Sequence, residues 1–487
     1  MRELRFGEFS PRAGTVRGLP WEGALLSCQS AVAENQPTIK HRVNKELSNF
    51  AARLGALISR PSAAISPGQF SDLALELFAL QCAHNPAYRQ ICEGLRVFPL
   101  AIKTWNQIPR VPTGAFKEIE LSSLNPEERT AVFYSSGTTG QKNSRHFHNR
   151  ESLNLYERSL WHSFADHFDR HNDFLFLTPP ASAVPNSSLI HMFETLRKKC
   201  DSPISSFTGQ LDQDGGWMVN FSASVGALER ACSTGGPITV LGTAFSFVHL
   251  LDYLAENDRQ FQLPAGSRVM ETGGYKNRSR VLPKQELHTL IAKYLGVGRD
   301  GIICEYGMSE LSSQAYDCAS RSGESRKPAE RKGSRGDAET RRRERAGSTA
   351  GQLPATTTEA DGGRLTSSHP SPLPLSPSRG EGAAMGSVNH SDEVGHDRPD
   401  SIRGAAEAAA GRYFQFPPWA RVQIISPETG EEVAAGETGL IRIFDLANVF
   451  SVAAIQTEDL GVRREMGFEL VGRAQLAEPR GCSLMTS

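Results

Sequence analysis

The sequence of 487 residues lacks an excess of charge of either sign and any regular arrangement of cysteines. Its 53 Lys and Arg residues against 54 Asp and Glu residues give a net charge of -1, so no overall cationic field is present to hold nucleic acid or an anionic membrane surface. The eight cysteines contain no CxxC pair, which argues against a disulfide scaffold and a structural zinc site. We therefore expect a protein of a reducing compartment that binds anions only locally and binds no nucleic acid.

Long apolar runs are also missing. No stretch approaches the roughly 20 apolar residues that span a bilayer, and the amino terminus has no apolar run of signal-peptide length. These absences predict a cytoplasmic protein without a membrane span.

Aromatic residues are absent from residues 319–412. This interval is rich in charge, proline and serine, a composition that cannot offset the entropy of ordering a chain. We predict a low-complexity, disordered insertion there, with a basic interaction arm as the functional alternative. The expected organisation is an N-terminal extension of uncertain order (1–65), a core (66–318), the insertion (319–412), and the rest of the core with a C-terminal tail (413–487). A globular domain interrupted in this way must bring Asp317 near Tyr413.

The rest of the sequence contains short apolar runs that alternate with helical stretches from residue 66 to residue 317. The first helix is expected to begin near a cap at Ser71 or Asp72. Alternating strands and helices are typical of an α/β protein with parallel strands. After residue 413, short apolar runs separated by Gly-containing turns predict antiparallel hairpins, and thus a small β-rich end.

The strongest local signal is the hydroxyl- and glycine-rich loop SSGTTG, residues 135–140, which follows a strand-like run. Glycines let a backbone approach phosphates closely, and hydroxyls donate hydrogen bonds to phosphate oxygens. Lys142 and Arg145 lie nearby as counter-charges. The loop lacks the GxxxxGK[ST] spacing of P-loop NTPases, and an ordinary flexible turn is the alternative.

Three further stretches carry polar groups at turns. In EYGMSE, residues 305–310, a ring could stack on a base and Glu310 could hold Mg²⁺ beside phosphates, whereas Ser309 could instead cap a helix. Asp459 and Arg473 flank a hairpin and could contact a ribose or form a simple salt bridge. Gly273 and Gly274 follow an apolar strand, where backbone could meet a ligand or merely turn.

Taken in chain order, these stretches resemble the acyl-adenylate-forming superfamily, whose members carry a Ser/Thr/Gly phosphate loop, a Tyr-Gly-x-[Thr/Ser]-Glu motif, a Thr-x-Asp-Leu-Gly motif and a Gly-Arg hairpin. Within it the chain is similar to the acyl-protein synthetase family, the long-chain-fatty-acid luciferin-component ligases of bacterial luminescence. Supporting segments are IPRVPTGAFKEIEL before the loop, SSLIHM (187–192), GTAF (242–245) and ETGGYK (271–276). The resemblance covers roughly residues 66–317 and 413–487.

The resemblance implies an ATP- and Mg²⁺-dependent ligase that activates a long-chain fatty acid to an acyl-adenylate and transfers the acyl group to a cysteine as a thioester. An acyl-protein reductase or another acyl acceptor is the implied partner. Catalytic roles are implied for Cys482, Glu310, Lys142 and Arg145, and Glu310 is the implied metal ligand. The implied nucleotide-binding residues are Ser135, Ser136, Gly137, Thr138, Thr139, Gly140, Gly273, Gly274, Tyr306, Gly307, Ser309, Asp459 and Arg473.

Cys482 lies near the end of the chain, where a tail could swing toward an activated acyl group. The resemblance makes it the acyl acceptor, and Arg480 could lower the pKa of its thiol.

The sequence departs from the superfamily pattern at two points. Lys142 comes one place early after the loop, and the chain ends soon after Arg473, without a C-terminal lid domain. The expected fold is therefore an α/β acyl-adenylate-forming large domain, with mixed sheets flanked by helices, a small β-rich end and no lid. The alternatives are an acid:CoA ligase of the aryl-CoA type and a catalytically degenerate relative.

Overall fold

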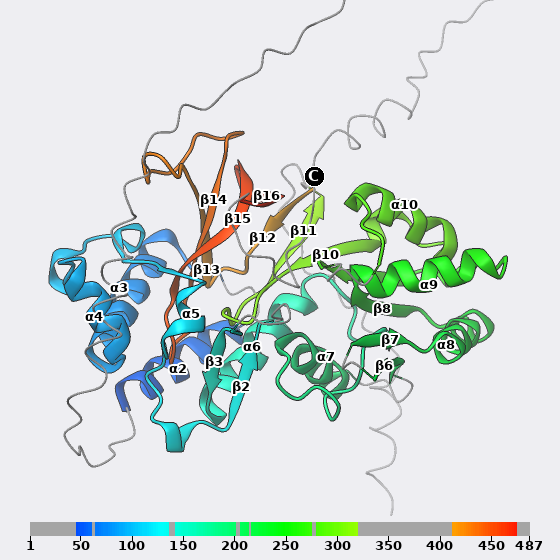
Figure 1. The fold of residues 1–487 in the computed structure, drawn as a ribbon, viewed down its shortest axis with the longest axis horizontal. Helices are drawn as coiled ribbons and strands as arrows, with labels where there is room; N and C mark the ends of the chain where they lie inside the picture. The colour runs from blue at the N-terminus through cyan, green and yellow to red at the C-terminus, as the bar shows by residue number, and fades with distance from the viewer. Residues whose placement is uncertain are drawn as a thin grey trace, which may run out of the picture. The chain divides into compact units, whose positions relative to one another are not determined.

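The computed structural model describes residues 45–60, 64–135, 142–200, 205–213, 216–274, 279–319 and 412–474. All of them belong to one compact unit, which joins the chain up to Ser320 with the chain from Ala410. Within these ranges, a sheet of 12 strands runs in the order β13-β14-β15-β16-β12-β11-β10-β9-β8-β4-β5, and β1 (Val111–Pro112) pairs with β15. Figure 1 shows the two halves of this sheet.

One half of the sheet is parallel. Its strands are β4 (Asp173–Phe176), β5 (Ser206–Phe207), β8 (Ile238–Thr243), β9 (Arg268–Thr272) and β10 (Ile302–Tyr306). The helices between and before them are α6 (Arg150–Ala165), α7 (Ser188–Lys199), α8 (Phe221–Thr234), α9 (Ala244–Glu256) and α10 (Lys284–Leu295). Every residue of β8 is buried, as expected for a parallel strand covered on both faces.

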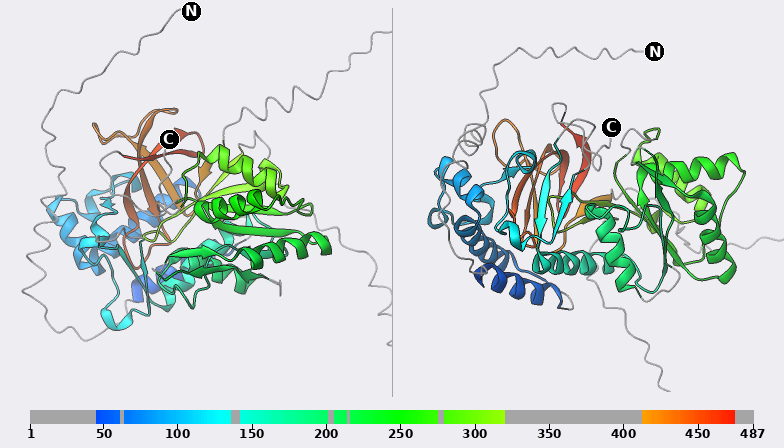
Figure 2. Two further views of the ribbon diagram at one scale, coloured as in Figure 1. Left: turned by 45° about the vertical axis from the view of Figure 1, so that its right-hand side comes forward. Right: turned by 60° about the horizontal axis from the view of Figure 1, so that its bottom comes forward.

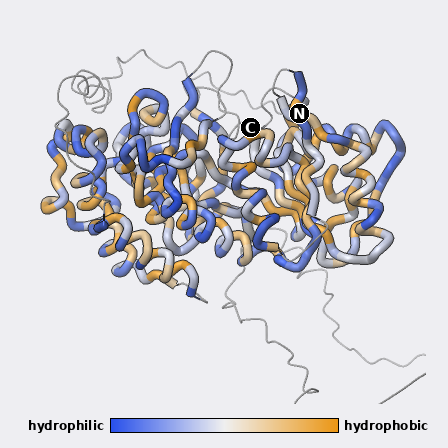
Figure 3. Tube along the Cα trace, turned by 90° about the horizontal axis from the view of Figure 1, so that it is seen from below, coloured by the Kyte–Doolittle hydropathy of each residue, from blue (hydrophilic) through white to orange (hydrophobic). Residues whose placement is uncertain are grey.

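Alternate residues of the central strands β8, β9 and β10 belong to two separate hydrophobic cores, one on each face of the sheet. Val240, Val269 and Ile302 pack with α8, α9 and α10, whereas Leu241, Met270 and Ile303 pack with α6 and α7. Successive side chains of a strand point to opposite faces, so the helices form a layer on each side of the sheet. Figure 3 shows hydrophobic and hydrophilic stretches alternating along the described elements.

The other half of the sheet is antiparallel. Its strands are β11 (Ala315–Ala319), β12 (Arg412–Gln415), β13 (Ala420–Ile425), β14 (Thr438–Asp445), β15 (Ala454–Arg464) and β16 (Gly467–Arg473). β11 pairs with β12, so that Asp317 lies opposite Phe414 and Ala319 lies opposite Arg412. The two ends of the aromatic-free interval therefore meet, as the sequence required. Ala319 and Arg412, placed in the insertion from sequence, are themselves strand residues, and residues 320–411 lie outside the described ranges.

Helices α2 (Lys45–Ile58), α3 (Pro67–His84) and α4 (Pro86–Gly94) pack beside the antiparallel strands, as Figure 2 shows. Residues 45–58 were assigned to an extension of uncertain order, but Leu47, Phe50, Leu54 and Ile58 recur at helical spacing and are buried in the core. The cap of α3 also differs from the prediction at Ser71 or Asp72. Ser66 accepts a hydrogen bond from Gln69 N, and Pro67 supplies the first helical residue.

The remaining elements are short. They are α5 (Ala115–Glu118), the hairpin of β2 (Ala131–Tyr134) and β3 (Arg145–His148), the hairpin of β6 (Gly209–Leu211) and β7 (Trp217–Val219), and 3₁₀ turns at Pro99–Ala101, Trp105–Gln107, Pro126–Glu128 and Arg299–Gly301. Among the residues that the structure describes, no helix combines the length and apolar character that crossing a bilayer requires.

Candidate active site

The base of the hydroxyl-rich loop is closed by the β2–β3 hairpin. Ser135 N donates to Ser144 O at 3.2 Å, and Ser144 N donates to Ser135 Oγ at 2.9 Å. This pair holds the two ends of the loop together. The loop residues Ser136, Gly137, Thr138, Thr139 and Gly140 lie outside the described residues.

Glu310 lies against this base. Its Oε1 accepts a hydrogen bond from Ser144 Oγ at 2.7 Å, and its Oε2 accepts one from Ser309 Oγ at 3.0 Å. The Nδ1 atom of His146, on β3, lies 2.8 Å from Ser309 O. Residues 166 positions apart thus meet at a buried carboxylate, and hydrogen bonds to charged groups are among the stronger ones.

His146 and Asn448 support this arrangement, and neither was singled out from sequence. Burial lowers the pKa of His146, so the neutral ring is favoured. Asn448 Nδ2 donates to Glu310 O at 2.7 Å, and its Oδ1 accepts from Ser312 Oγ at 2.7 Å. The alternation of the RHFH strand gave a weak signal for His146, since it places that ring on the buried side. No local signal marks Asn448, because its role exists only after distant segments have packed.

Tyr306 joins the EYGMSE stretch to the C-terminal hairpin that carries Asp459 and Arg473. Its hydroxyl donates to Asp459 Oδ2 at 2.8 Å, and Arg473 Nε lies 3.6 Å from Asp459 Oδ1. Asp459 and Arg473 face each other in the β15–β16 ladder, and Arg473 also pairs with Glu458. The Tyr306 ring is buried against Phe414, Phe416 and Phe468, so its stacking on a base stays a prediction.

Gly273 and Gly274 leave the end of β9 beside the end of β10, because Thr272 lies opposite Glu305 in that parallel pair. Gly274 has a φ of 120°, a conformation that favours glycine. A Cβ atom on Gly307 would collide with Oε1 of Glu305. The loops that follow two adjacent parallel strands therefore meet at one sheet edge, the usual place for a ligand in such folds.

Glu305 begins the EYGMSE stretch, but no role for its side chain was predicted from sequence. Its Oε2 accepts a hydrogen bond from Thr272 Oγ1 at 2.6 Å. Burial raises the pKa of Glu305 to about 7, the Thr272 hydrogen bond opposes this, and the neighbouring Glu271 adds to it. A buried carboxyl that titrates near neutrality is a marker of functional sites.

Lys142 and Arg145 point to carboxylates outside the motifs. Lys142 Nζ lies 2.9 Å from Glu118 Oε2, and Arg145 lies 3.3 Å from Glu120 Oε1. The structure therefore places both cations in ion pairs on the side of α5, and their contact with phosphates stays a prediction. Cys482 lies outside the described residues.

The donor set around Glu310 fits Mg²⁺. This ion takes oxygen ligands and is commonly held by one or two carboxylates together with substrate phosphates. Glu310 supplies a carboxylate, with the hydroxyls of Ser144 and Ser309 beside it. No group of three metal-ligating side chains occurs within the described ranges, so the phosphates would have to complete such a site.

The fold and these contacts define a class of α/β protein with a polar site at the carboxyl ends of parallel strands. Within this class, the sequence profile of the family described as acyl-protein synthetase, LuxE, matches residues 68–330, which is more than half of the chain. The chain belongs to the acyl-protein synthetase family.

A curated relative is the long-chain-fatty-acid–luciferin-component ligase of Vibrio harveyi, 25% identical over 217 residues. The match covers 43% of this chain and 54% of the relative, so the chain spans about half the length of that protein.

Solved structures with similar folds include an open conformation of 2-hydroxyisobutyryl-CoA ligase in complex with 2-HIB-AMP and CoA, at 11% identity and a TM-score of 0.49, covering 87% of this chain and 79% of that one. A luciferase-like enzyme from the mealworm Zophobas morio shows 11% identity and a TM-score of 0.38, covering 98% of this chain and 100% of that one.

Proposed function

We propose that this chain activates a long-chain fatty acid with ATP and transfers the acyl group to a protein cysteine as a thioester. The observation that carries the proposal is the convergence of three distant stretches. Ser144, at the base of the loop, contacts Glu310, while Tyr306 of the same motif as Glu310 contacts Asp459. Membership of the acyl-protein synthetase family supports the reaction class.

In the first step, a carboxylate oxygen of the fatty acid attacks the α-phosphorus of ATP. A bond forms between that oxygen and phosphorus, and pyrophosphate leaves with the electrons of the broken bond. Two anions must approach each other, so catalysis depends on positioning and on neutralising charge.

In this proposal, residues 135–140 hold the phosphates, and Glu310 with Ser309 holds Mg²⁺, which when bound neutralises phosphate charge. Asp459 and Arg473 contact the ribose, and Gly273, Gly274 and Gly307 let the backbone approach the adenylate. Tyr306 holds Asp459 through its hydroxyl, as its 2.8 Å contact suggests, and its ring lies near adenine. Lys142 and Arg145 reach phosphate only by leaving Glu118 and Glu120.

In the second step, the thiolate of Cys482 attacks the acyl carbonyl carbon. A carbon–sulfur bond forms, and AMP leaves with the electrons of the broken carbon–oxygen bond. Four cysteines of the described ranges, Cys82, Cys92, Cys200 and Cys304, are buried, whereas Cys232 is exposed. Burial raises the pKa of Cys304, which disfavours its reactive thiolate. An acyl-protein reductase or another acyl acceptor would then take the acyl group.

The test is covalent labelling of the purified chain with a radiolabelled long-chain fatty acid and MgATP. We expect ATP-dependent labelling that hydroxylamine removes, as it does from thioesters. Cys482→Ser should abolish the label, whereas Cys232→Ser, a change at an exposed cysteine, should retain it. Persistent labelling of the Cys482→Ser variant would refute the acceptor assignment. Formation of acyl-CoA on addition of CoA, without protein labelling, would favour the acid:CoA ligase, and absence of both products would favour a degenerate relative.

A further inference from the structure

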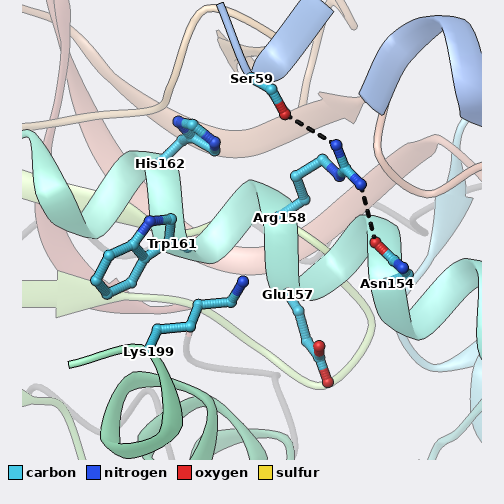
Figure 4. A pocket seen from close by; sticks show the side chains of 7 residues that line it. All are labelled: Ser59, Asn154, Glu157, Arg158, Trp161, His162 and Lys199. Atoms are coloured by element: carbon cyan, nitrogen blue, oxygen red, sulfur yellow. Dashed lines mark hydrogen bonds between the residues drawn. The ribbon is translucent and has the colours of Figure 1, made fainter. Parts of the chain in front are cut away.

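A polar cavity lies on the surface of α6, and none of the residues of the candidate active site lines it. It has a volume of about 480 Å³ and is lined by Ser59, Asn154, Glu157, Arg158, Trp161, His162 and Lys199. Five of these residues lie on α6 at the spacing of one helical stripe. The neighbouring stripe is buried and holds Tyr156 and Ser159, which accepts a hydrogen bond from Trp419 Nε1 at 2.8 Å. The cavity thus opens on a separate stripe of the helix, with Ser59 and Lys199 at its edges, as Figure 4 shows.

Arg158 is held in place by neutral groups. Its NH1 donates to Ser59 Oγ at 3.0 Å, and its NH2 donates to Asn154 Oδ1 at 3.3 Å (Figure 4). Hydroxyl and amide oxygens orient a guanidinium without neutralising its charge, which leaves it able to bind an oxyanion. Within the described part of the chain, neither Arg158 nor Lys199 forms an ion pair with a carboxylate.

The acidic residue of the lining, Glu157, is engaged elsewhere. Its Oε1 lies 3.1 Å from His191 Nε2, and that hydrogen bond is the main cause of its lowered pKa, to which the charges of Lys199 and Lys198 add. Burial is the main cause of the lowered pKa of His162; the charges of Arg158 and Lys199 lower this pKa further, and the charge of Asp166 opposes them. The lining therefore places the cations Arg158 and Lys199 beside a neutral imidazole that can form hydrogen bonds.

Trp161 gives the cavity an apolar wall. Its ring is half-buried, and Lys199 Nζ lies 5.9 Å from the ring centroid. An indole face beside two cations suits a ligand that combines a planar group with an anionic one. The volume falls within the usual range of small-molecule pockets, roughly 300–1,000 Å³.

From these observations we infer that the α6 cavity binds a small phosphate ester, with its phosphate between Arg158 and Lys199 and a planar group against Trp161. A phosphate ester matches the two cations, since it carries up to two negative charges and several acceptor oxygens. The site goes beyond the proposed acyl transfer and uses none of its residues.

The test is calorimetric titration of the full chain with phenyl phosphate and with inorganic phosphate. We expect saturable binding that is tighter for phenyl phosphate and weakens with added salt. Lys199→Gln should weaken the binding of both probes about fivefold or more. Trp161→Ala should remove the advantage of phenyl phosphate while leaving inorganic phosphate nearly unchanged.

Lys198→Gln is the matched control. Lys198 is the neighbouring residue on α7, is similarly exposed, pairs with Glu194 at 3.6 Å and does not line the cavity, so we expect less than a twofold effect. Glu310→Gln should leave this binding intact, because the nucleotide site is elsewhere. Equal losses from Lys198→Gln and Lys199→Gln would show non-specific screening and overturn the proposal. So would absence of saturable binding, or binding that only Glu310→Gln removes. Lys199 is an exposed residue, so its variant tests the site without depending on the packing of Arg158.

Discussion

Glu310 is the central residue of the candidate site, because its buried carboxylate contacts Ser144 and Ser309 and its backbone oxygen contacts Asn448. Only 1% of its surface is exposed, yet it keeps two hydroxyl partners from different parts of the chain. A buried charge is tolerated when hydrogen bonds replace its lost hydration. The donors are therefore expected to matter for both stability and activity.

Replacing Ser144 by Ala removes one of these donors. We expect a loss of about 1–3 kcal/mol in the free energy of unfolding, because a buried charged acceptor loses a partner. Urea denaturation followed by circular dichroism measures this loss. Ser48→Ala is the matched control, since Ser48 Oγ also donates to a glutamate, Glu151 Oε2, at 2.7 Å but at an exposed position. Its cost should stay within about 0.5 kcal/mol. Equal effects of the two substitutions would mean that the Ser144 contact is not special.

Glu305 predicts a particular dependence of stability on pH. Its pKa rises from an ordinary value near 4.5 to about 7 in the folded chain. The folded state then holds more protons than the unfolded state between these two values, so stability falls as pH rises through this window. The loss amounts to about 3 kcal/mol at most.

Glu305→Gln removes this titration while leaving an oxygen to accept from Thr272. We expect the variant to lose less stability than the parent chain between pH 5 and pH 7.5, as measured by urea midpoints at several pH values. Asp445, whose pKa burial raises to about 6, adds a fall of the same sign to both proteins. Parallel curves for the parent and the variant would contradict the account.

Motif residues and supporting residues differ in how well the sequence reveals them. Glu310, Tyr306 and Asp459 stand in recognisable strings, and in the structure Tyr306 contacts Asp459 while Glu310 contacts Ser144. Asn448 contacts Glu310, which is distant in sequence, and the raised pKa of Glu305 results mainly from burial. No local sequence pattern indicates either property. The contact of Lys142 with phosphate stays a prediction, and the structure adds the ion pair with Glu118, which no sequence pattern indicated.

At the scale of elements, the β11–β12 pair closes the sheet across residues 320–411. Asp317 is fully buried, with Lys284 Nζ at 2.7 Å and Arg412 at 3.1 Å. Burial works against the ionisation of Asp317, but these two cations outweigh it and lower its pKa. The ion pairs of Asp317 with Arg412 and with Lys284 thus join β11 to β12 and to α10.

This pairing predicts that residues 320–411 can be replaced by a two-residue Asn-Gly turn, which suits residues that face each other in antiparallel strands. We expect cooperative melting within about 5 °C of the parent chain, since the cost of loop closure depends only weakly on loop length. Differential scanning calorimetry is the measurement. A deletion extended to residues 317–413 should be clearly destabilised, because it removes Asp317 and Arg412. Failure of the shorter deletion to fold would show that the interval is structural.

Element type was more predictable than element boundaries. The alternation of apolar runs and helical stretches indicated the parallel half of the sheet, and the Gly-containing turns indicated the antiparallel half. Helix α2 was missed because its apolar stripe lies in a sequence that otherwise gave little periodicity. That stripe gains its stability from packing, including the contact of α2 with α6.

At the scale of the whole molecule, the N-terminal helices are tied to the site through one loop. Gln81 Nε2 donates to Asn448 O at 2.8 Å, and Asn85 Nδ2 donates to Ser451 O at 3.3 Å. Asn448 in turn donates to Glu310 O. The helices α3 and α4 therefore support the position of the Glu310 loop from a distance, and the site depends on the complete fold.

The central claim is that three distant stretches form one site that binds ATP and activates a carboxylate. Its most direct measurement is fatty-acid-dependent exchange of labelled pyrophosphate into ATP, with the parent chain and with Glu310→Gln, Asp459→Asn and the control Glu229→Gln, a change at an exposed glutamate that pairs with Arg259 outside the site. We predict exchange in the parent chain, a loss of about 100-fold or more in the first two variants, as when charge stabilisation is removed from an active site, and nearly full exchange in the control. Parent-like exchange in either site variant, or no exchange by the parent chain with any fatty acid, would contradict the claim.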